Sequence, residues 1–213
     1  MSRQHKEIRF VSGNKFKIAE AEQILSAVGV AVVPVALKIE ELQITDTPKL
    51  VRDKLLKAFG KIRRPLFVEH TGLYLKQLNM LPGGLTQVFW DALGAELFTE
   101  RFGRSDTQVI AKTTVAYCDG RRIYQFEGEI EGEVVATPRG SRDFQWDCVF
   151  QPKGYDKTFA ELGDKKNEIS MRRLALNELS FPRFFGHRKR GFTLKKGAQH
   201  GQEEQTIYRR IQA

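Results

Sequence analysis

The sequence predicts an α/β fold with a central mixed β-sheet and flanking helices. Over roughly the first 70 residues, patterns typical of strands and helices alternate in the order β-α-β-α-β. Crossovers of this length are usually helices, so the alternation favours parallel strand pairing. Two further β-rich runs are separated by Asp119-Gly120, a strong hairpin signal, and they indicate an antiparallel part of the same sheet.

A short turn joins the first strand to the first helix. Residues 8–11 (IRFV) form a β run, and Ser12, Gly13 and Asn14 follow it as the turn. The apolar residues that then recur at helical spacing are Ile18, Ala21, Ile24, Leu25 and Val28. Gly29 is a stop signal for this helix.

The second and third strands flank the second helix. Residues 31–37 (AVVPVAL) read as a strand, and residues 47–62 (TPKLVRDKLLKAFGKI) are typical of a helix. Thr47 is the expected cap of this helix, with Pro48 in its first turn. The third strand, residues 64–70 (RPLFVEH), is expected to end where its polar residues begin.

The second half of the chain contains the hairpin and one more helix. Residues 107–120 and 121–135 are the two hairpin strands, and a last helix, residues 166–181 (KNEISMRRLALNELSF), closes the globular region. We divide the chain into one domain, residues 1–180, and a basic C-terminal extension, residues 181–213.

The composition fits one globular unit in the cytoplasm. With 213 residues and 41% hydrophobic content, the chain can bury one substantial core. No stretch approaches the roughly 18 to 20 consecutive apolar residues of a membrane span, and the first residues lack the apolar run of a secretory signal. Cys118 and Cys148 have neither zinc-site spacing nor the density of a disulfide scaffold, so we expect reduced packing residues.

The net charge of +9 is concentrated in the extension, where eight Lys or Arg residues oppose two Glu. Phe184, Phe185, Phe192 and Tyr208 are interspersed there, a mixture that could suit nucleic acid through phosphate contacts and stacking. The alternatives are a solvated surface or an arm that docks on an acidic partner. No nucleic-acid module accompanies the extension, so we do not expect a nucleic-acid partner.

Residues 12–17 (SGNKFK) and two glutamates suggest a phosphate and metal site. Free backbone N–H groups and the helix dipole favour phosphate near Ser12 and Asn14, and Lys17 adds a full charge. Alternatively, Asn14 simply caps the helix. Glu41 and Glu69 could supply the carboxylate oxygens that Mg²⁺ prefers, although either alone reads as a solvated surface carboxylate.

The segment 141–162 is dense in aromatic residues, namely Phe144, Trp146, Phe150, Tyr155 and Phe159. An aromatic wall beside Asp147 would suit a purine, one group stacking and the other accepting ring N–H protons. From these residues alone an ordinary aromatic core is the favoured reading. Lys166, Ser170 and Arg172 offer a second place that could hold anionic or carbonyl groups.

Five ordered motifs resemble the inosine triphosphate pyrophosphatase (Ham1-like) family, which hydrolyses ITP, dITP and XTP to the monophosphate and pyrophosphate. The motifs are SGNKFK for Thr/Ser-x-Asn-x-x-Lys, ELQ at 41–43, VEHTGL...LPG for Val-Glu-Asp-Thr-Gly-Leu...Leu-Pro-Gly, FQWDCVFQPKGYDKTFAEL for Phe-Gly-Trp-Asp-Pro-x-Phe-x-Pro-x-Gly-Tyr-x-x-Thr-x-Ala-Glu, and KNEISMR for Lys-Asn-x-x-Ser-His-Arg. Their order and spacing hold from about residue 7 to residue 180.

The resemblance implies an elongated fold, a nucleotide cleft between two lobes and a homodimer. By position, Ser12, Asn14 and Lys17 would hold phosphates, while Glu41 and Glu69 would hold Mg²⁺. The residues implied for the base pocket are Phe144, Trp146, Asp147 and Arg172, with Lys166 near the phosphates or base. A 6-oxopurine pairs with an acceptor such as Asp147 and a donor such as Arg172, whereas adenine reverses that pattern.

Four departures from the family pattern bear on the chemistry of the site. His70 stands where the family has a metal-binding aspartate, and an imidazole nitrogen suits Mg²⁺ poorly, so the metal could be weakly bound or replaced by Mn²⁺. Gln87 replaces a phosphate-contacting basic residue, Gln145 a glycine and Met171 a histidine. His70 could still act as a general base, with Lys17 and Glu69 completing the catalytic set.

These departures favour a dITP or ITP receptor with impaired hydrolysis. Relatives are also similar to subunits of bacterial anti-phage operons, where dITP binding activates a sirtuin-like NADase, and such an effector is a hypothetical partner. The alternative is an active metal-dependent pyrophosphatase that uses His70 or another metal. A third hypothesis, a structural or nucleic-acid-binding protein that does not use the cleft, predicts no stabilisation by nucleotides.

Overall fold

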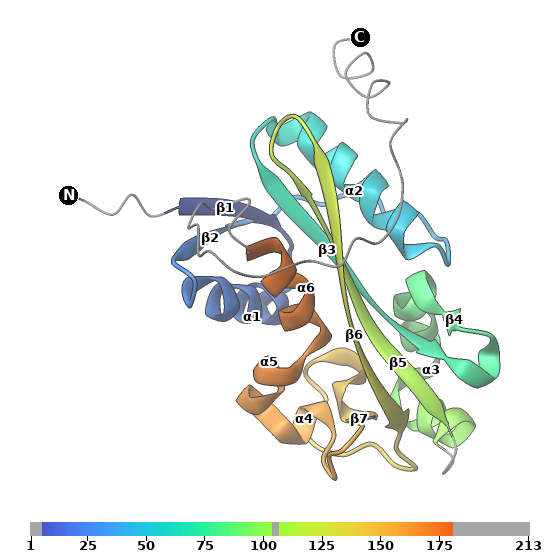
Figure 1. The fold of residues 1–213 in the computed structure, drawn as a ribbon. Helices are drawn as coiled ribbons and strands as arrows, with labels where there is room; N and C mark the ends of the chain where they lie inside the picture. Colours follow the sequence, from blue (N-terminus) through green and yellow to red (C-terminus); the bar gives the residue numbers. More distant parts are fainter. Residues whose placement is uncertain (1–5, 104–106, 181–213) are drawn as a thin grey trace, which may run out of the picture.

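A seven-stranded mixed sheet runs through the computed structural model, which describes residues 6–103 and 107–180 (Figure 1). The strand order is β2-β1-β3-β5-β6-β7, and β4 pairs with β3 outside this path. The strands are β1 (Lys6–Val11), β2 (Val30–Val35), β3 (Leu66–Leu75), β4 (Leu81–Pro82), β5 (Gln108–Cys118), β6 (Ile123–Val134) and β7 (Phe150–Pro152).

The α-helices are α1 (Lys15–Ser26), α2 (Thr47–Ile62), α3 (Thr86–Phe102), α4 (Phe159–Leu162), α5 (Lys166–Ile169) and α6 (Met171–Ser180). Short 3-10 helices are η1 (Lys76–Leu78), η2 (Gly83–Leu85), η3 (Gln145–Cys148) and η4 (Gly163–Lys165). Helices α1 and α6 pack on one face of the sheet, while α2 packs on the other (Figure 1). The predicted mixed sheet with flanking helices is therefore confirmed.

The first three strands are parallel, as the β-α-β-α-β order predicts. Strand β1 pairs along its whole length with β2, but it meets β3 only where Arg9 and Phe10 face Leu66 and Phe67. After Phe67, β3 no longer pairs with β1, although it stays paired with β5. The turn after β1 therefore lies beside the edge of β3 that β1 leaves unpaired.

The hairpin predicted at Asp119-Gly120 is also confirmed. Strands β5 and β6 pair antiparallel from Gln108 opposite Glu133 to Cys118 opposite Ile123. In the turn, the carboxylate of Asp119 accepts the backbone N–H groups of the two following arginines at 2.7 and 2.8 Å. Gly120 has φ +98°, a conformation that residues with a Cβ rarely adopt.

The prediction that the third strand ends at His70 is wrong, because the strand continues to Leu75. Its polar residues stay in the sheet because β5 offers matching partners, such as Thr113 Oγ1 at 2.8 Å from Thr71 Oγ1. Gly72 also permits a close approach, since a Cβ there would lie 2.4 Å from the Gly83 carbonyl oxygen.

Two helix ends differ from the prediction. Asp46, not Thr47, caps α2, and its carboxylate accepts the Lys49 N–H at 3.0 Å. The predicted last helix is broken at Ser170, whose extended backbone ends α5. The Ser170 hydroxyl then accepts the Arg173 N–H at 3.1 Å and so caps α6.

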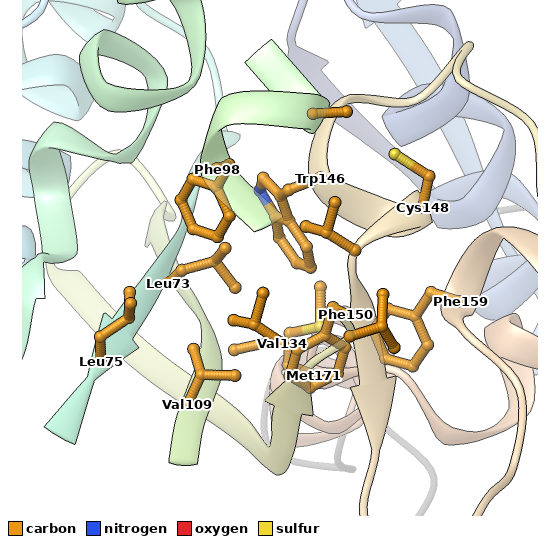
Figure 2. Close-up of a cluster of buried hydrophobic side chains, with 14 residues drawn as sticks. Leu73, Leu75, Phe98, Val109, Val134, Trp146, Cys148, Phe150, Phe159 and Met171 are labelled. Atoms are coloured by element: carbon orange, nitrogen blue, oxygen red, sulfur yellow. The ribbon is translucent and has the colours of Figure 1, made fainter. Parts of the chain in front are cut away.

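The aromatic residues of the segment 141–162 contribute largely to the core. Trp146, Phe150 and Phe159 pack in one buried cluster with residues of β3, β5 and α3 (Figure 2). The core interpretation is confirmed for these three rings. Cys118 and Cys148 are buried and free, in agreement with the prediction of reduced packing residues.

Across the described ranges, the structure contains no helix with the length and hydropathy needed to cross a membrane. The basic extension, residues 181–213, lies outside the described residues, so the division of the chain at residue 180 stays a prediction.

Candidate functional site

The turn after β1 presents the start of α1 to open space. Asn14 Oδ1 accepts the backbone N–H groups of Phe16 and Lys17 at 3.0 and 3.1 Å, so Asn14 is the cap of the helix. Ser12 Oγ accepts the Asn14 N–H at 3.2 Å. A Cβ at Gly13 would meet no atom within 4 Å. The capping alternative is therefore confirmed for Asn14, and two of the N–H groups expected to be free for phosphate are occupied by its side chain. The helix end remains accessible, and an anion there would meet the positive end of the helix dipole and Lys17.

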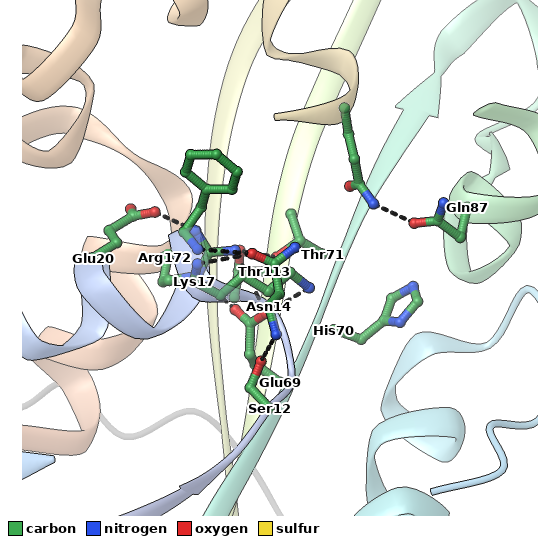
Figure 3. A network of polar contacts seen from close by, with 12 residues as sticks. Ser12, Asn14, Lys17, Glu20, Glu69, His70, Thr71, Gln87, Thr113 and Arg172 are labelled. Atoms are coloured by element: carbon green, nitrogen blue, oxygen red, sulfur yellow. Dashed lines mark hydrogen bonds and ion pairs between the residues drawn. The ribbon is translucent and has the colours of Figure 1, made fainter. Parts of the chain in front are cut away.

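A buried ionic network lies next to this turn (Figure 3). Glu69 Oε1 is 2.8 Å from Lys17 Nζ, and Glu69 Oε2 accepts a hydrogen bond from Arg172 Nε at 2.7 Å. Arg172 also donates through NH1 to Glu20, which in turn accepts the hydroxyl of Ser170. Arg172, Glu69 and Glu20 are only 1%, 3% and 4% exposed, so Glu69 is not the surface carboxylate that the sequence alone suggested.

The network sets the charge of its members. Burial alone would raise the pKa of Glu69, but the charges of Arg172 and Lys17 outweigh it and hold that pKa well below its usual range. Burial lowers the pKa of Lys17, assisted by Arg172 and opposed by Glu69. The network therefore contains an ionised carboxylate at neutral pH, held between two cationic side chains.

Helix α6 brings Arg172 to this network because Gly128 of β6 allows a very close approach. A Cβ at Gly128 would lie 2.1 Å from the Met171 carbonyl oxygen. Met171, at the position that departs from the family pattern, is buried in the core. It contributes packing to the site, together with the backbone contact that fixes the start of α6.

His70 lies with Glu41 and Lys54 on the opposite face of β3. His70 Nδ1 is 3.4 Å from Glu41 Oε2, and Lys54 Nζ donates to Glu41 Oε1 at 2.7 Å. Burial would raise the pKa of Glu41, but the hydrogen bond with His70 and the charge of Lys54 lower it to about 2. His70 Nε2 is buried, and no described residue forms a hydrogen bond with it.

The two carboxylates predicted to hold a metal thus have separate surroundings. Glu69 contacts Lys17 and Arg172, whereas Glu41 contacts Lys54 and His70. Within residues 6–103 and 107–180, no group of three or more His, Cys, Asp or Glu side chains is arranged to hold a metal ion. Any metal bound here would need ligands from phosphate and water in addition.

Most of the residues predicted for a base pocket line one very small cavity. A cavity of about 10 Å³ is lined by Lys17, Thr71, Phe144, Gln145, Trp146, Asp147, Met171 and Arg172. Lys166 Nζ forms an ion pair with Asp147 Oδ2 at 2.5 Å and lies 4.2 Å from the centre of the Phe144 ring. Burial raises the pKa of Asp147, with Lys166 opposing the shift. This cavity holds about one water molecule, whereas ligand pockets commonly measure roughly 300 to 1,000 Å³.

The structure therefore gathers most of the predicted residues into one site. Lys17, Phe144, Trp146, Asp147 and Arg172 share the small cavity. Lys166 joins it through Asp147 and Glu69 through Arg172, while Ser12 and Asn14 form the adjacent turn. The remaining pair, Glu41 and His70, is on the other side of β3.

Sequence reasoning missed Glu20 and Lys54. Glu20 lies three residues after Lys17 and directly before Ala21, on the apolar side of α1, where a carboxylate needs a buried cation. That position is the signal that could have found it. Lys54 gave no such signal, because an isolated lysine on a helix is normally solvated.

A larger cavity of about 420 Å³ lies far from these residues, at the end of the sheet formed by β5, β6 and β7. Its polar side chains already contact one another: Lys153 pairs with Glu131 at 2.9 Å, and the Gln151 amide donates to Glu133 at 2.9 Å. None of the predicted site residues lines it, so we place the candidate site at the small cavity.

Comparisons with known proteins give the family of this chain. A sequence model of the Ham1 family matches residues 8–181. The chain is 39% identical over 175 residues to an inosine triphosphate pyrophosphatase from Yarrowia lipolytica, covering 80% of this chain and 92% of the relative. It is 34% identical over 177 residues to a dITP/XTP pyrophosphatase from Methanopyrus kandleri, covering 82% and 94%.

Solved structures show the same likeness. A HAM1 protein from Coxiella burnetii superposes with a TM-score of 0.66 at 26% sequence identity, covering 82% of this chain and 96% of that protein. The family match spans all five motifs, and the relatives align over nearly their whole length. The chain therefore belongs to the Ham1 family.

Proposed function

We propose that this protein hydrolyses deaminated purine nucleoside triphosphates, dITP, ITP and XTP, to the monophosphate and pyrophosphate. The names of the two relatives above support this activity. From the sequence alone, it is the alternative to a receptor with impaired hydrolysis. The single observation that carries the proposal is that Asp147, Arg172 and Lys17 line one cavity together with the Phe144 ring. These are the groups needed for a 6-oxopurine and its phosphates.

Base recognition follows from the polarity of Asp147 and Arg172. The carboxylate accepts the N1–H of a 6-oxopurine, and the guanidinium donates to O6. In the structure the Asp147 carboxylate is paired with the Lys166 ammonium group. A bound base would replace this ion pair with a hydrogen bond from its N1–H to Asp147. Adenine would place a lone pair against Asp147 and an amino group against Arg172, leaving buried polar groups unpaired.

The triphosphate would extend from this pocket toward the N-terminus of α1 and Lys17. In the reaction the oxygen of a water molecule forms a bond to the α-phosphorus, the bond from that phosphorus to the bridging oxygen breaks, and pyrophosphate leaves. His70 is our candidate for the base that takes the proton from the water. Its Nδ1 faces Glu41, and no described residue forms a hydrogen bond with Nε2.

A divalent ion would neutralise the phosphate charge and lower the barrier to attack. Glu41 and Glu69 have the carboxylate chemistry for it, yet each is already paired with a lysine. The imidazole beside Glu41 adds a nitrogen, which suits Mn²⁺ better than Mg²⁺. Glu69 lies on the opposite face of β3 from Glu41, so the described arrangement does not fit one ion held by both carboxylates. We therefore propose that Glu41, together with phosphate and water oxygens, would hold the ion and that Mn²⁺ supports turnover better than Mg²⁺ does.

A second candidate function is nucleotide binding without turnover. It is favoured by the Glu69 carboxylate, which Lys17 and Arg172 already satisfy, and by His70 at the aspartate position of the family motif. In that case the protein would report dITP to a partner, with an NADase-type effector in anti-phage defence as the specific hypothesis. A homodimer is compatible with both candidates.

One experiment separates these functions. Purified protein is mixed with dITP, ITP, XTP, dGTP or ATP, with Mg²⁺ and then with Mn²⁺, and pyrophosphate release and thermal stabilisation are followed in the same samples. Release from dITP, ITP or XTP but not from ATP supports the pyrophosphatase. Selective stabilisation without release supports the binding function, and neither effect with any nucleotide contradicts both.

A further inference from the structure

Two glutamines from distant parts of the chain meet beside the small cavity. Gln145 begins η3 and lines the cavity, and Gln87 lies in the first turn of α3. Gln145 Nε2 donates a hydrogen bond to Gln87 Oε1, the dashed contact beside Gln87 in Figure 3. The sequence departs from the family pattern at both Gln87 and Gln145, and here they are direct partners.

A third residue fixes the direction of this contact. Gln87 Nε2 donates to Asp91 Oδ1 at 2.6 Å, one helical turn further along α3. An ionised carboxylate only accepts hydrogen bonds, so Asp91 orients the Gln87 amide with its oxygen toward Gln145. The chain Gln145 to Gln87 to Asp91 therefore has one consistent direction of donation.

The backbone of Gln145 is in a conformation that glycine adopts more easily. Its φ is +44°, in the left-handed region that costs free energy for a residue with a Cβ. Glycine, which the family motif has here, would relieve that cost but could not make the contact. The side chain of Gln145 thus ties η3 to α3 where the family pattern has no side chain.

The tie matters because η3 forms one wall of the pocket. Phe144, Trp146 and Asp147 all line the cavity of about 10 Å³, which is too small for a purine. Lys166 links η3 to α5 through Asp147, and Phe16 links it to α1, with ring centres 5.1 Å from Phe144. Trp146 also shares a buried cluster with Phe98 of α3, so the Gln145 contact adds a hydrogen bond to the apolar packing between η3 and α3.

We propose that the Gln87–Gln145 pair is a clasp that holds the pocket shut, and that residues 144–148 move away from α3 when a nucleotide enters. The inference rests on the proposed function only for the identity of the ligand. A neutral, partly exposed hydrogen bond of this kind shifts an equilibrium by roughly two- to tenfold. Removing the clasp should raise the open fraction by that factor.

The clasp can be tested without a nucleotide by acrylamide quenching of the Trp146 fluorescence, because Trp146 is only 4% exposed in the closed pocket. In a Trp90→Phe background Trp146 is the remaining tryptophan, because the chain has two. Gln87→Ala and Gln145→Ala should each increase the acrylamide quenching rate constant roughly two- to tenfold. The double variant should add little to either single change, because both remove the same contact.

The matched control is Gln108→Ala, an exposed glutamine of β5 that pairs with Lys76. It should leave quenching unchanged, and urea unfolding should show that every variant is folded. Unchanged quenching in both clasp variants, or a double variant equal to the product of two independent effects, would overturn the clasp.

A second measurement links the clasp to the ligand. If opening limits binding, the apparent Kd for dITP should fall by the same factor as quenching rises. Increased quenching with an unchanged Kd would overturn the role of the clasp in nucleotide entry. Failure of the wild type and all variants to bind dITP would contradict the proposed function, while the quenching result would still decide whether the clasp exists.

Discussion

Glu69 and His70 are adjacent in β3, but their side chains serve opposite faces of the sheet. Glu69 Oε2 accepts from Arg172 Nε at 2.7 Å, and His70 Nδ1 lies 3.4 Å from Glu41. Successive residues of a strand alternate between faces, and Thr71, which also contacts Arg172, shares the face of Glu69. Two consecutive residues of β3 thus serve two different sites. Glu69 belongs to the ionic network that faces α1 and α6, and His70 lies on the face covered by α2.

Replacing Glu69 should destabilise the protein strongly. Glu69→Gln leaves the buried Arg172 and the partly buried Lys17 without the carboxylate they share, and breaking a buried pair typically costs about 3–5 kcal/mol. Urea unfolding at pH 7 measures this change. Glu22→Gln, at an exposed glutamate of α1, is the matched control and should alter the free energy of unfolding by less than about 0.5 kcal/mol.

The same variant tests the pH dependence. The pKa of Glu69 is lower in the folded state than its ordinary value of 4.5, so the folded protein binds fewer protons than the unfolded chain. Its contribution is complete above pH 4.5 and is lost as the pH falls further. Glu41, with a pKa of about 2, acts in the same direction. The stability difference between wild type and Glu69→Gln should therefore shrink on acidification; a constant difference down to pH 3 would refute the ionic assignment.

Local signals were sufficient for much of the fold. Asp119-Gly120 predicted the hairpin because a turn is decided within a few residues. By contrast, Asp46 and Thr47 are both good caps, and only the backbone decides between them. The strand through His70 continued because Thr113, 42 positions after Thr71, offers it a partner.

The sequence predicts which residues belong to the site better than it predicts which of them contact one another. The motifs identified Asp147 and Arg172, which do line one cavity. The contact from Arg172 to Glu69 spans 103 positions and that from Arg172 to Glu20 spans 152, and no local pattern encodes such pairs. The contact between Gln87 and Gln145 belongs to the same class, because neither residue predicts the other.

Restoring the family residue at position 70 should change both metal preference and rate. His70→Asp places a carboxylate beside Glu41 and removes a nitrogen, which favours Mg²⁺. If the imidazole limits metal binding, pyrophosphate release from dITP with Mg²⁺ should rise by roughly 100-fold, the usual effect of one electrostatic stabiliser of a transition state. Mg²⁺ affinity measured calorimetrically in the presence of a non-hydrolysable dITP analogue should rise as well.

His70→Asn is the control for this prediction, because it removes the imidazole without adding charge. It should bind dITP as the wild type does and should show no gain with Mg²⁺. If His70 is the base, turnover by His70→Asn with Mn²⁺ should fall by about 100-fold or more. Wild-type rates in both variants would exclude a catalytic role for His70.

The base preference should depend on Asp147. In Asp147→Asn the side chain keeps its shape and one acceptor oxygen but gains an NH₂ group, so it can accept from N1–H of hypoxanthine or donate to N1 of adenine and no longer favours one base. The ratio of dissociation constants for dATP and dITP should fall by about tenfold or more, as expected when one buried polar group loses its partner. Asp156→Asn, at an exposed aspartate of the same segment, is the matched control and should leave the ratio unchanged. Equal ratios in wild type and Asp147→Asn, with both proteins folded by urea titration, would mean that Asp147 serves only to hold Lys166 and does not read the base.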